Sequence, residues 1–297
     1  MQSKTETIQL DGFGIRLTTW GDEACQPILF LHGFMDVGAS FHSICEQLGH
    51  AYYCVAPDLR GFGGSDHTQH PLGYYFFDYL FDLFSLLERF SRRSICLVGH
   101  SMGGNIASMF AGSFPERISH LVNIEGFGPR GLPDDDAPDQ LRRWLTDQTP
   151  HRFRVYPTLE GLAKRLQTKN RALTDLDAQW IASQMSRPIS GGIQISADPK
   201  HKRPSPMIIP VAQYAAFWRR IRAKTILMIG EQSNFGNWLP AGVDATAELD
   251  RRLSNFPADT QRLIVARSGH MVHLDRPDAV VSAIRGLLAG RSIPSPL

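Results

Sequence analysis

Residues 95–104, with the sequence ICLVGHSMGG, constrain the fold of this chain more than any other segment. They begin as a continuous apolar run, which is typical of a strand buried on both faces, and end in small residues that suit a closely packed helix. Between the two lies a G-x-S-x-G turn, in which a strained backbone leaves no room for bulky neighbours of the serine. Gly99 and Gly103 supply that room, so the Ser101 hydroxyl is exposed at the end of the strand, beside the unpaired N–H groups of the helix. Ser101 is therefore the candidate nucleophile.

The rest of the chain repeats this alternation of a short apolar run with an amphipathic segment. Buried strands are expected at residues 28–31, 52–56, 95–98, 121–124, 226–229 and 263–266, and a more alternating antiparallel edge at 6–10 and 15–20. Helices are expected at 74–90, 102–114, 244–254 and 277–288, the first with Phe77, Leu80, Phe81, Phe84, Leu86 and Leu87 near one face. Strands that alternate with helices predict an α/β fold with a mostly parallel sheet covered by helices on both faces.

Residues 128–222 interrupt the alternation, because they contain no apolar strand run. Helical patterns appear within this stretch at 159–166 and 174–185. A loop of this length without structure of its own is uncommon. The sequence therefore predicts a helical lid, or cap, at 128–222, inserted into a core made of residues 1–127 and 223–297.

The predicted lid also differs in charge from the rest of the chain. Residues 130–222 carry 16 Lys and Arg against 9 Asp and Glu. This excess either steers an anionic substrate or lies on solvated helix surfaces, and we favour the second. The large aromatic residues of the lid either line an acyl pocket or form the core of the lid itself. They are Trp144, Phe153, Trp180, Phe217 and Trp218.

Composition narrows the class of protein. The 297 residues suffice for one large domain with an insertion, and a net charge of +2 gives no reason to expect nucleic acid or a membrane as partner. No apolar run approaches the ~18 residues of a transmembrane helix, and the N-terminal residues lack the core of a signal peptide. Cys25, Cys45, Cys54 and Cys96 match no zinc or redox spacing and are expected to be reduced thiols. We expect a cytoplasmic protein with a small-molecule substrate, no metal and no organic cofactor, and the sequence indicates no particular oligomeric state.

The backbone donors of an oxyanion hole follow from the same strand ends. In a fold of this kind, the loop after the strand at 28–31 supplies one N–H group, and the residue after the nucleophile supplies the other. These residues are Phe34 and Met102. Because backbone donors suffice for this role, His32 is expected to be a structural histidine.

A candidate general base follows the last strand. The segment SGHMVHL, residues 268–274, contains two histidines. His270 is nearer to the end of the strand, where loop residues face the carboxyl edge of the sheet. His273 is expected to begin the next helix. We therefore favour His270 over His273 as the catalytic histidine.

Together with DLRGFGGS at residues 58–65, these segments resemble the α/β-hydrolase superfamily over nearly the whole chain outside the predicted lid. The segment HGFMD at 32–36, followed by Ser40 and Phe41, is more narrowly similar to the serine-hydrolase-like branch. The resemblance implies an α/β-hydrolase fold and a triad of serine, histidine and an acidic residue.

The triad acid is where the chain departs from the family pattern. The family usually places an aspartate a few residues after the strand at 226–229, and this chain has Ser233 there, which cannot carry the required charge. Some relatives, including certain haloalkane dehalogenases, place the acid one strand earlier. Glu125 directly follows the strand at 121–124. We therefore predict Glu125 as the acid, with Glu231 as the second candidate.

The predicted function is a serine hydrolase that cleaves a carboxylester, a thioester or a lactone. Ser101 attacks the carbonyl, His270 transfers the proton, Glu125 stabilises the imidazolium, and water resolves the acyl-enzyme. One alternative is a carbon–carbon bond hydrolase or another non-esterase enzyme on the same fold, and another is a non-catalytic binding protein. A serine nucleophile argues against dehalogenase and epoxide-hydrolase chemistry, because the relatives with those activities use an aspartate there.

Overall fold

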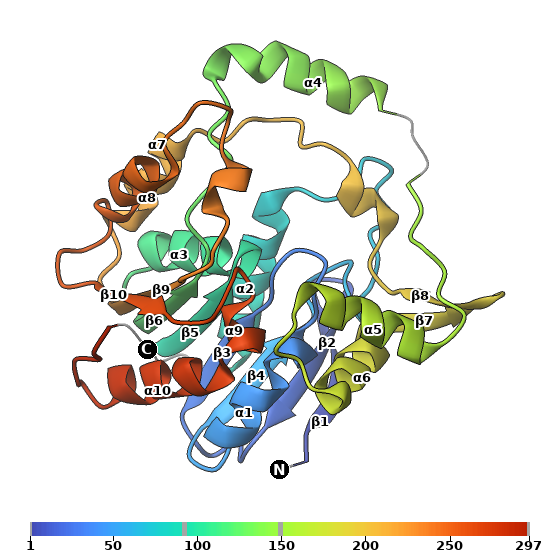
Figure 1. Ribbon diagram of the computed structural model, residues 1–297, viewed down its shortest axis with the longest axis horizontal. Helices are drawn as coiled ribbons and strands as arrows, with labels where there is room; N and C mark the ends of the chain where they lie inside the picture. Colours follow the sequence, from blue (N-terminus) through green and yellow to red (C-terminus); the bar gives the residue numbers. More distant parts are fainter. Residues whose placement is uncertain (1, 91–93, 148–150, 296–297) are drawn as a thin grey trace.

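One eight-stranded sheet forms the centre of the molecule, seen in a computed structural model that describes residues 2–90, 94–147 and 151–295 (Figure 1). Its strands are β1 (Lys4–Leu10), β2 (Phe13–Trp20), β3 (Pro27–Leu31), β4 (Tyr53–Pro57), β5 (Ile95–His100), β6 (Ile118–Ile124), β9 (Lys224–Gly230) and β10 (Gln261–Val265). They lie in the order β1-β2-β4-β3-β5-β6-β9-β10, antiparallel from β1 to β4 and parallel from β4 to β10. The predicted mostly parallel sheet with an antiparallel edge is confirmed.

Helices cover both faces of this sheet, because its central strands are apolar on both sides. On one face lie α1 (His42–Leu48), α9 (Val272–Asp275) and α10 (Pro277–Leu288), packed over a core that includes the fully buried Phe30 and Phe41. On the other face lie α2 (Phe76–Phe90), α3 (Met102–Ser113), α7 (Val211–Trp218) and α8 (Ala245–Leu253), around a second core that includes Trp218. All four cysteines are free, and three of them are buried. The cytoplasmic location stays a prediction.

Helix α2 buries only part of the face expected from the sequence. Leu86 and Leu87 of that face are buried, together with Tyr79 and Leu83. Phe77, Phe81 and Phe84 of the same face are 50%, 52% and 38% exposed. The helix carries apolar residues on more than half of its surface, so periodicity alone does not decide which stripe faces the sheet. A polar contact does decide it, because the buried Asp82 carboxylate forms an ion pair with Arg60.

Residues 128–222, the predicted lid, have helices as most of their regular elements. Much of the segment extends beyond the sheet, whereas α7 at its end packs against α3 (Figure 1). Their elements are η2 (Asp134–Asp136), α4 (Ala137–Thr146), α5 (Leu159–Lys169), α6 (Asp175–Gln184), β7 (Ser186–Ile189), β8 (Gly192–Ile195), η3 (Pro199–Lys202) and α7. The β7–β8 hairpin was not predicted. Its four-residue strands are only half-buried and give no apolar run, and the turn between them uses Gly191 at φ 85°.

A histidine sandwich joins this segment to the core. The ring of His201 in η3 stacks between Phe62 and Tyr74, with ring centroids 3.9 and 3.8 Å away. The hydroxyl of Tyr74 donates to Asp198 at 2.9 Å. Burial lowers the pKa of His201 to about 3, so its ring stays neutral within the aromatic stack. The hairpin end of the predicted lid is therefore fixed to the loop that follows β4.

Arg252 of α8 fixes the other end of the segment. Its side chain is 1% exposed and pairs with Glu248 at 2.7 Å. The same guanidinium donates to the backbone carbonyls of Phe127 at 2.9 Å and Pro129 at 2.6 Å. This is the point where the chain leaves β6 and enters the predicted lid.

We expect Arg252→Met to lower the free energy of unfolding by roughly 2–4 kcal/mol, because it leaves the buried Phe127 carbonyl and the part-buried Pro129 carbonyl without their donor. The matched control is Arg251→Met, since Arg251 binds the same Glu248 carboxylate but its side chain is 58% exposed. That change should cost less than about 1 kcal/mol. Urea unfolding followed by circular dichroism measures both, and equal effects would contradict the anchoring role of Arg252.

Candidate active site

Ser101 occupies a strained turn between β5 and α3. Its φ of 52° and ψ of −112° lie where a non-glycine residue rarely falls, and its N–H donates to the carbonyl of Ile124 at 2.8 Å. A Cβ atom on Gly99 would lie 2.3 Å from the Gly103 oxygen, and one on Gly103 would lie 2.1 Å from the Leu31 oxygen. Close packing of β3, β5 and α3 therefore requires both glycines and holds the serine in its strained conformation.

We expect Gly103→Ala to reduce hydrolysis of a p-nitrophenyl ester, the activity predicted from the sequence, by about 100-fold or more, because the strands and helix must separate and the serine must move with them. The free energy of unfolding should fall by roughly 1–3 kcal/mol from overpacking. Gly161→Ala is the matched control, since a Cβ there would be 3.7 Å from its nearest neighbour. Kinetics with p-nitrophenyl esters and urea unfolding test this, and a Gly103→Ala protein with wild-type values in both would refute it.

Glu125 lies beside Ser101 because β5 and β6 run parallel, with His100 opposite Ile124 in the register. Its backbone is also left-handed, at φ 58°, and its side chain is only 2% exposed. The turn aims the carboxylate across the sheet edge toward the end of β9. The Oε1 atom accepts the N–H of Gly230 there, at 2.8 Å.

The second carboxylate oxygen has two partners. Oε2 of Glu125 lies 3.2 Å from Nδ1 of His270 and accepts the hydroxyl of Ser233 at 2.6 Å. With Nδ1 facing the carboxylate, Nε2 is the His270 nitrogen that can serve Ser101. This geometry meets the distance expected for an acid and its histidine, and the catalytic role of Glu125 stays a prediction.

The second candidate acid lies elsewhere. Glu231 is exposed, and its carboxylate accepts the backbone N–H of Arg267 at 2.9 Å. Ser233, in contrast, occupies the usual position of the acid and donates to Glu125. Sequence reasoning treated Ser233 only as a missing charge, and no sequence signal marked it as a partner of Glu125.

The loop after β3 contains His32, expected to be a structural histidine, and Phe34, a predicted oxyanion donor. The imidazole of His32 is fully buried, with Nδ1 2.7 Å from the Gly33 oxygen and Nε2 accepting the Leu59 N–H at 2.9 Å. Burial lowers the pKa of His32, so the ring is a neutral structural link between two loops. Phe34 and Met102, the predicted oxyanion donors, line the same cavity as Ser101.

Ser101, Glu125 and His270 open onto one cavity of about 590 Å³. Its aromatic lining consists of Phe34, Phe127, Phe235 and Trp238, and its polar lining includes Asn105, Arg130 and Asn237. None of the five lid aromatics considered from the sequence lines this cavity, and two of them, Phe153 and Trp218, belong to the buried core. The cavity aromatics follow strands β3, β6 and β9, and position at a strand end was the signal that could have identified them.

Comparison with known proteins defines the class. A family model described as the alpha/beta hydrolase fold matches residues 26–277, and the chain belongs to that family. More narrowly, it is 27% identical over 286 residues to a serine hydrolase-like protein of Danio rerio, which covers 94% of this chain and 86% of that protein. Serine hydrolase-like protein 2 of Homo sapiens is 22% identical over 293 residues, with 92% and 90% covered. The resemblance to the serine-hydrolase-like branch is confirmed.

A solved structure supports the fold independently. The thioesterase domain from the curacin biosynthetic pathway superposes with a TM-score of 0.85 at 24% identity, covering 96% of this chain and 100% of that chain. Within the described residues, none of the helices has both the length and the apolar character required to span a membrane.

Proposed function

We propose that this protein is a serine hydrolase that cleaves an ester-type bond through an acyl-enzyme, with Ser101, His270 and Glu125 as its triad. The observation that carries the proposal is the contact of 3.2 Å between the Glu125 carboxylate and Nδ1 of His270, beside a serine in a strained strand-to-helix turn. Membership of the α/β-hydrolase family supports a hydrolytic reaction.

The proposed reaction begins with proton transfer from Ser101 Oγ to Nε2 of His270 as Oγ attacks the carbonyl carbon. The buried Glu125 carboxylate stabilises the imidazolium that forms. The backbone N–H groups of Phe34 and Met102 stabilise the oxyanion. His270 then protonates the leaving group, and the same histidine activates the water that releases the acid.

The proposed substrate class is a carboxylester, a thioester or a lactone with an apolar acyl part. Four aromatic residues in a cavity of about 590 Å³ suit an apolar acyl chain. The thioesterase name of the curacin domain keeps thioesters in this class. The second candidate is cleavage of a carbon–carbon bond by the same triad. Assays with p-nitrophenyl esters of different chain length distinguish this reaction from ester hydrolysis.

We also propose that residues 128–222 act as a lid over this cavity. Gly128, Pro129 and Arg130, the first residues of the segment, contribute to the cavity lining. The remaining residues connect back to the core through α7, which packs on α3. This arrangement allows the segment to limit access of substrate and water.

The nucleophile is tested with Ser101→Ala. The change should lower kcat for a p-nitrophenyl ester by ~10⁴-fold or more without changing the fold, because the attacking oxygen is removed. A fluorophosphonate probe should label the wild-type protein at Ser101 and leave the variant unlabelled. Activity within tenfold of wild type in the folded variant would exclude Ser101 as the nucleophile, and failure of the wild type to react with probe or esters would favour a binding protein.

The acid is tested with Glu125→Gln against Glu231→Gln. The amide keeps the size of Glu125 but removes the charge that stabilises the imidazolium, so kcat should fall by up to ~10⁴-fold. Glu231→Gln should retain nearly full activity, because that carboxylate is exposed and accepts the Arg267 N–H. The reverse order of effects would assign the acid to Glu231.

A compensating change provides an independent check. Ser233→Asp in the background of Glu125→Asn returns the carboxylate to the strand where the family usually carries it, and asparagine tolerates the left-handed backbone at residue 125. The double variant should be at least about tenfold more active than Glu125→Asn alone, which corresponds to ~1.4 kcal/mol of transition-state stabilisation. No recovery in a folded double variant would argue against an acid shared between these two positions.

A further inference from the structure

We propose that His100 is a positioning residue that holds the catalytic loop through the backbone of His270. The proposal rests on the function proposed above. His100 is the last residue of β5 and directly precedes Ser101. Its side chain is buried beneath the loop that carries His270, and its Nε2 lies 2.8 Å from the His270 carbonyl oxygen. Because a carbonyl only accepts, this nitrogen carries the proton and donates.

The other nitrogen of the His100 ring makes the arrangement unusual. Nδ1 is buried and has no hydrogen-bond partner among the described residues. It faces Gly33, where an added Cβ would lie 2.8 Å from it. An unsatisfied buried nitrogen costs about 1–3 kcal/mol, which an apolar side chain would avoid. Stability therefore gives no reason for a histidine here, and the bond to His270 does.

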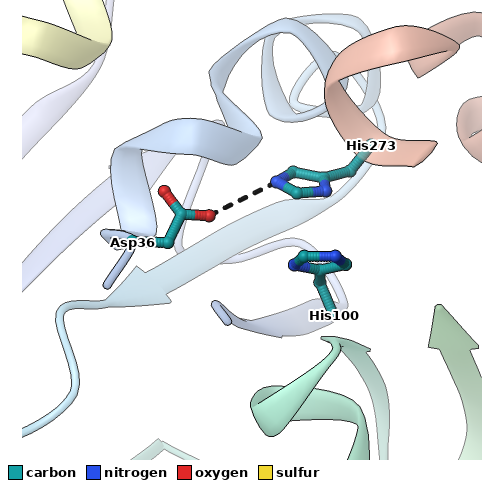
Figure 2. A group of neighbouring side chains, drawn as sticks. All are labelled: Asp36, His100 and His273. Carbon is teal, nitrogen blue, oxygen red and sulfur yellow. Dashed lines mark ion pairs between the residues drawn. The ribbon is translucent and has the colours of Figure 1, made fainter. Parts of the chain in front are cut away.

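The ring of His273 covers that of His100, and Asp36 in turn forms an ion pair with His273 (Figure 2). The centroids of the two rings lie 4.2 Å apart. The Nε2 atom of His273 lies 3.4 Å from Oδ2 of Asp36, which also accepts the Ser40 hydroxyl at 2.9 Å. Burial alone would raise the pKa of Asp36, but its hydrogen bond and electrostatic interaction with His273, with smaller contributions from His32 and the Val37 backbone, hold that pKa below its ordinary value.

This cluster connects three elements to one loop. Asp36 and Ser40 follow β3 and hold His273 at the start of α9, while His100 at the end of β5 holds the backbone of His270 three residues earlier. Glu125 holds the imidazole of His270 from β6. The loop that carries the proposed base is therefore fixed on both its backbone and its side chain.

His100 must stay neutral in this position. Its ring lies 4.9 Å from that of His270, where a positive charge would oppose formation of the imidazolium. Burial lowers the pKa of His100 well below its ordinary value, and the neighbouring His273, His270 and His32 act in the same direction. A neutral donor thus orients the base without competing with it for a proton.

A divalent cation is the competing occupant of the cluster. Asp36, His100 and His273 each offer one ligand atom, all within 4.8 Å of one another. The contacts of Asp36 with Ser40 and His273, and of His100 with the His270 carbonyl, account for most of these groups without an ion. We therefore assign the cluster to positioning, and the experiment includes the metal as an outcome.

The test compares His100→Leu, which removes the donor, with His100→Gln, whose amide nitrogen reaches about as far as Nε2. His100→Leu should lower kcat for a p-nitrophenyl ester by ~100-fold with KM within about threefold, because the base is misplaced while the cavity is unchanged. The acid limb of the kcat/KM profile should move to lower pH, since a misaligned Glu125 stabilises the imidazolium less. His100→Gln should recover activity to within about tenfold of wild type. His50→Leu, at an exposed histidine, is the control and should change nothing.

Three results would overturn the proposal. The first is a wild-type kcat in folded His100→Leu. The second is an equal loss of kcat in His100→Leu and His100→Gln with an unshifted pH profile, which would show that His100 acts only through its packing. If His100→Leu does not fold, His100→Asn replaces it, since its amide is too short to reach the carbonyl and the same loss is expected. The third is loss of wild-type activity on chelation with recovery on adding Zn²⁺, which would make the cluster a metal site. Failure of the proposed function is recognised separately, because the wild type would then neither hydrolyse esters nor react with the probe at Ser101.

Discussion

The close approach of β5, α3 and β3 at Ser101 is the constraint on which the rest of the site depends. A left-handed serine costs about 1–3 kcal/mol and persists only where its surroundings leave no alternative. Here the Gly99 and Gly103 positions contact backbone atoms directly, and the serine N–H is held by the carbonyl of Ile124. Backbone packing therefore imposes the strain. It fixes the backbone position of Ser101 independently of the other side chains of the site.

A left-handed backbone directly after a parallel strand also occurs one strand away, at Glu125. Its backbone φ of 58° is also left-handed, and it follows β6 as Ser101 follows β5. Because these strands are parallel neighbours, two strained residues stand side by side at the carboxyl edge of the sheet. His270 reaches this edge from the loop after β10, on the far side of β9. Three different strands thus supply the proposed triad, and the order of the sheet brings them together.

The sequence predicts the parts of this molecule that local physics determines. A buried strand followed by G-x-S-x-G has few alternatives, so the turn at Ser101 could be located directly. The orientation of α2 could not, because Phe77, Phe81 and Phe84 form a second apolar stripe, which the structure leaves largely exposed. The choice between the stripes depends on Asp82 and Arg60, which are distant in sequence. The cavity aromatics and the contact of Ser233 with Glu125 depend on long-range packing in the same way.

Electrostatics explains why a serine suits position 233 when the acid is at 125. The Ser233 hydroxyl lies 2.6 Å from the carboxylate of Glu125. A second carboxylate at that distance would repel the first, and one of the two would bind a proton and lose its value to an imidazolium. A hydroxyl instead donates to the charged form and stabilises it, as the N–H of Gly230 does on the other oxygen. If Glu125 is the acid, as proposed, a serine at the usual acid position is the residue expected, because its hydroxyl stabilises the charged carboxylate one strand away.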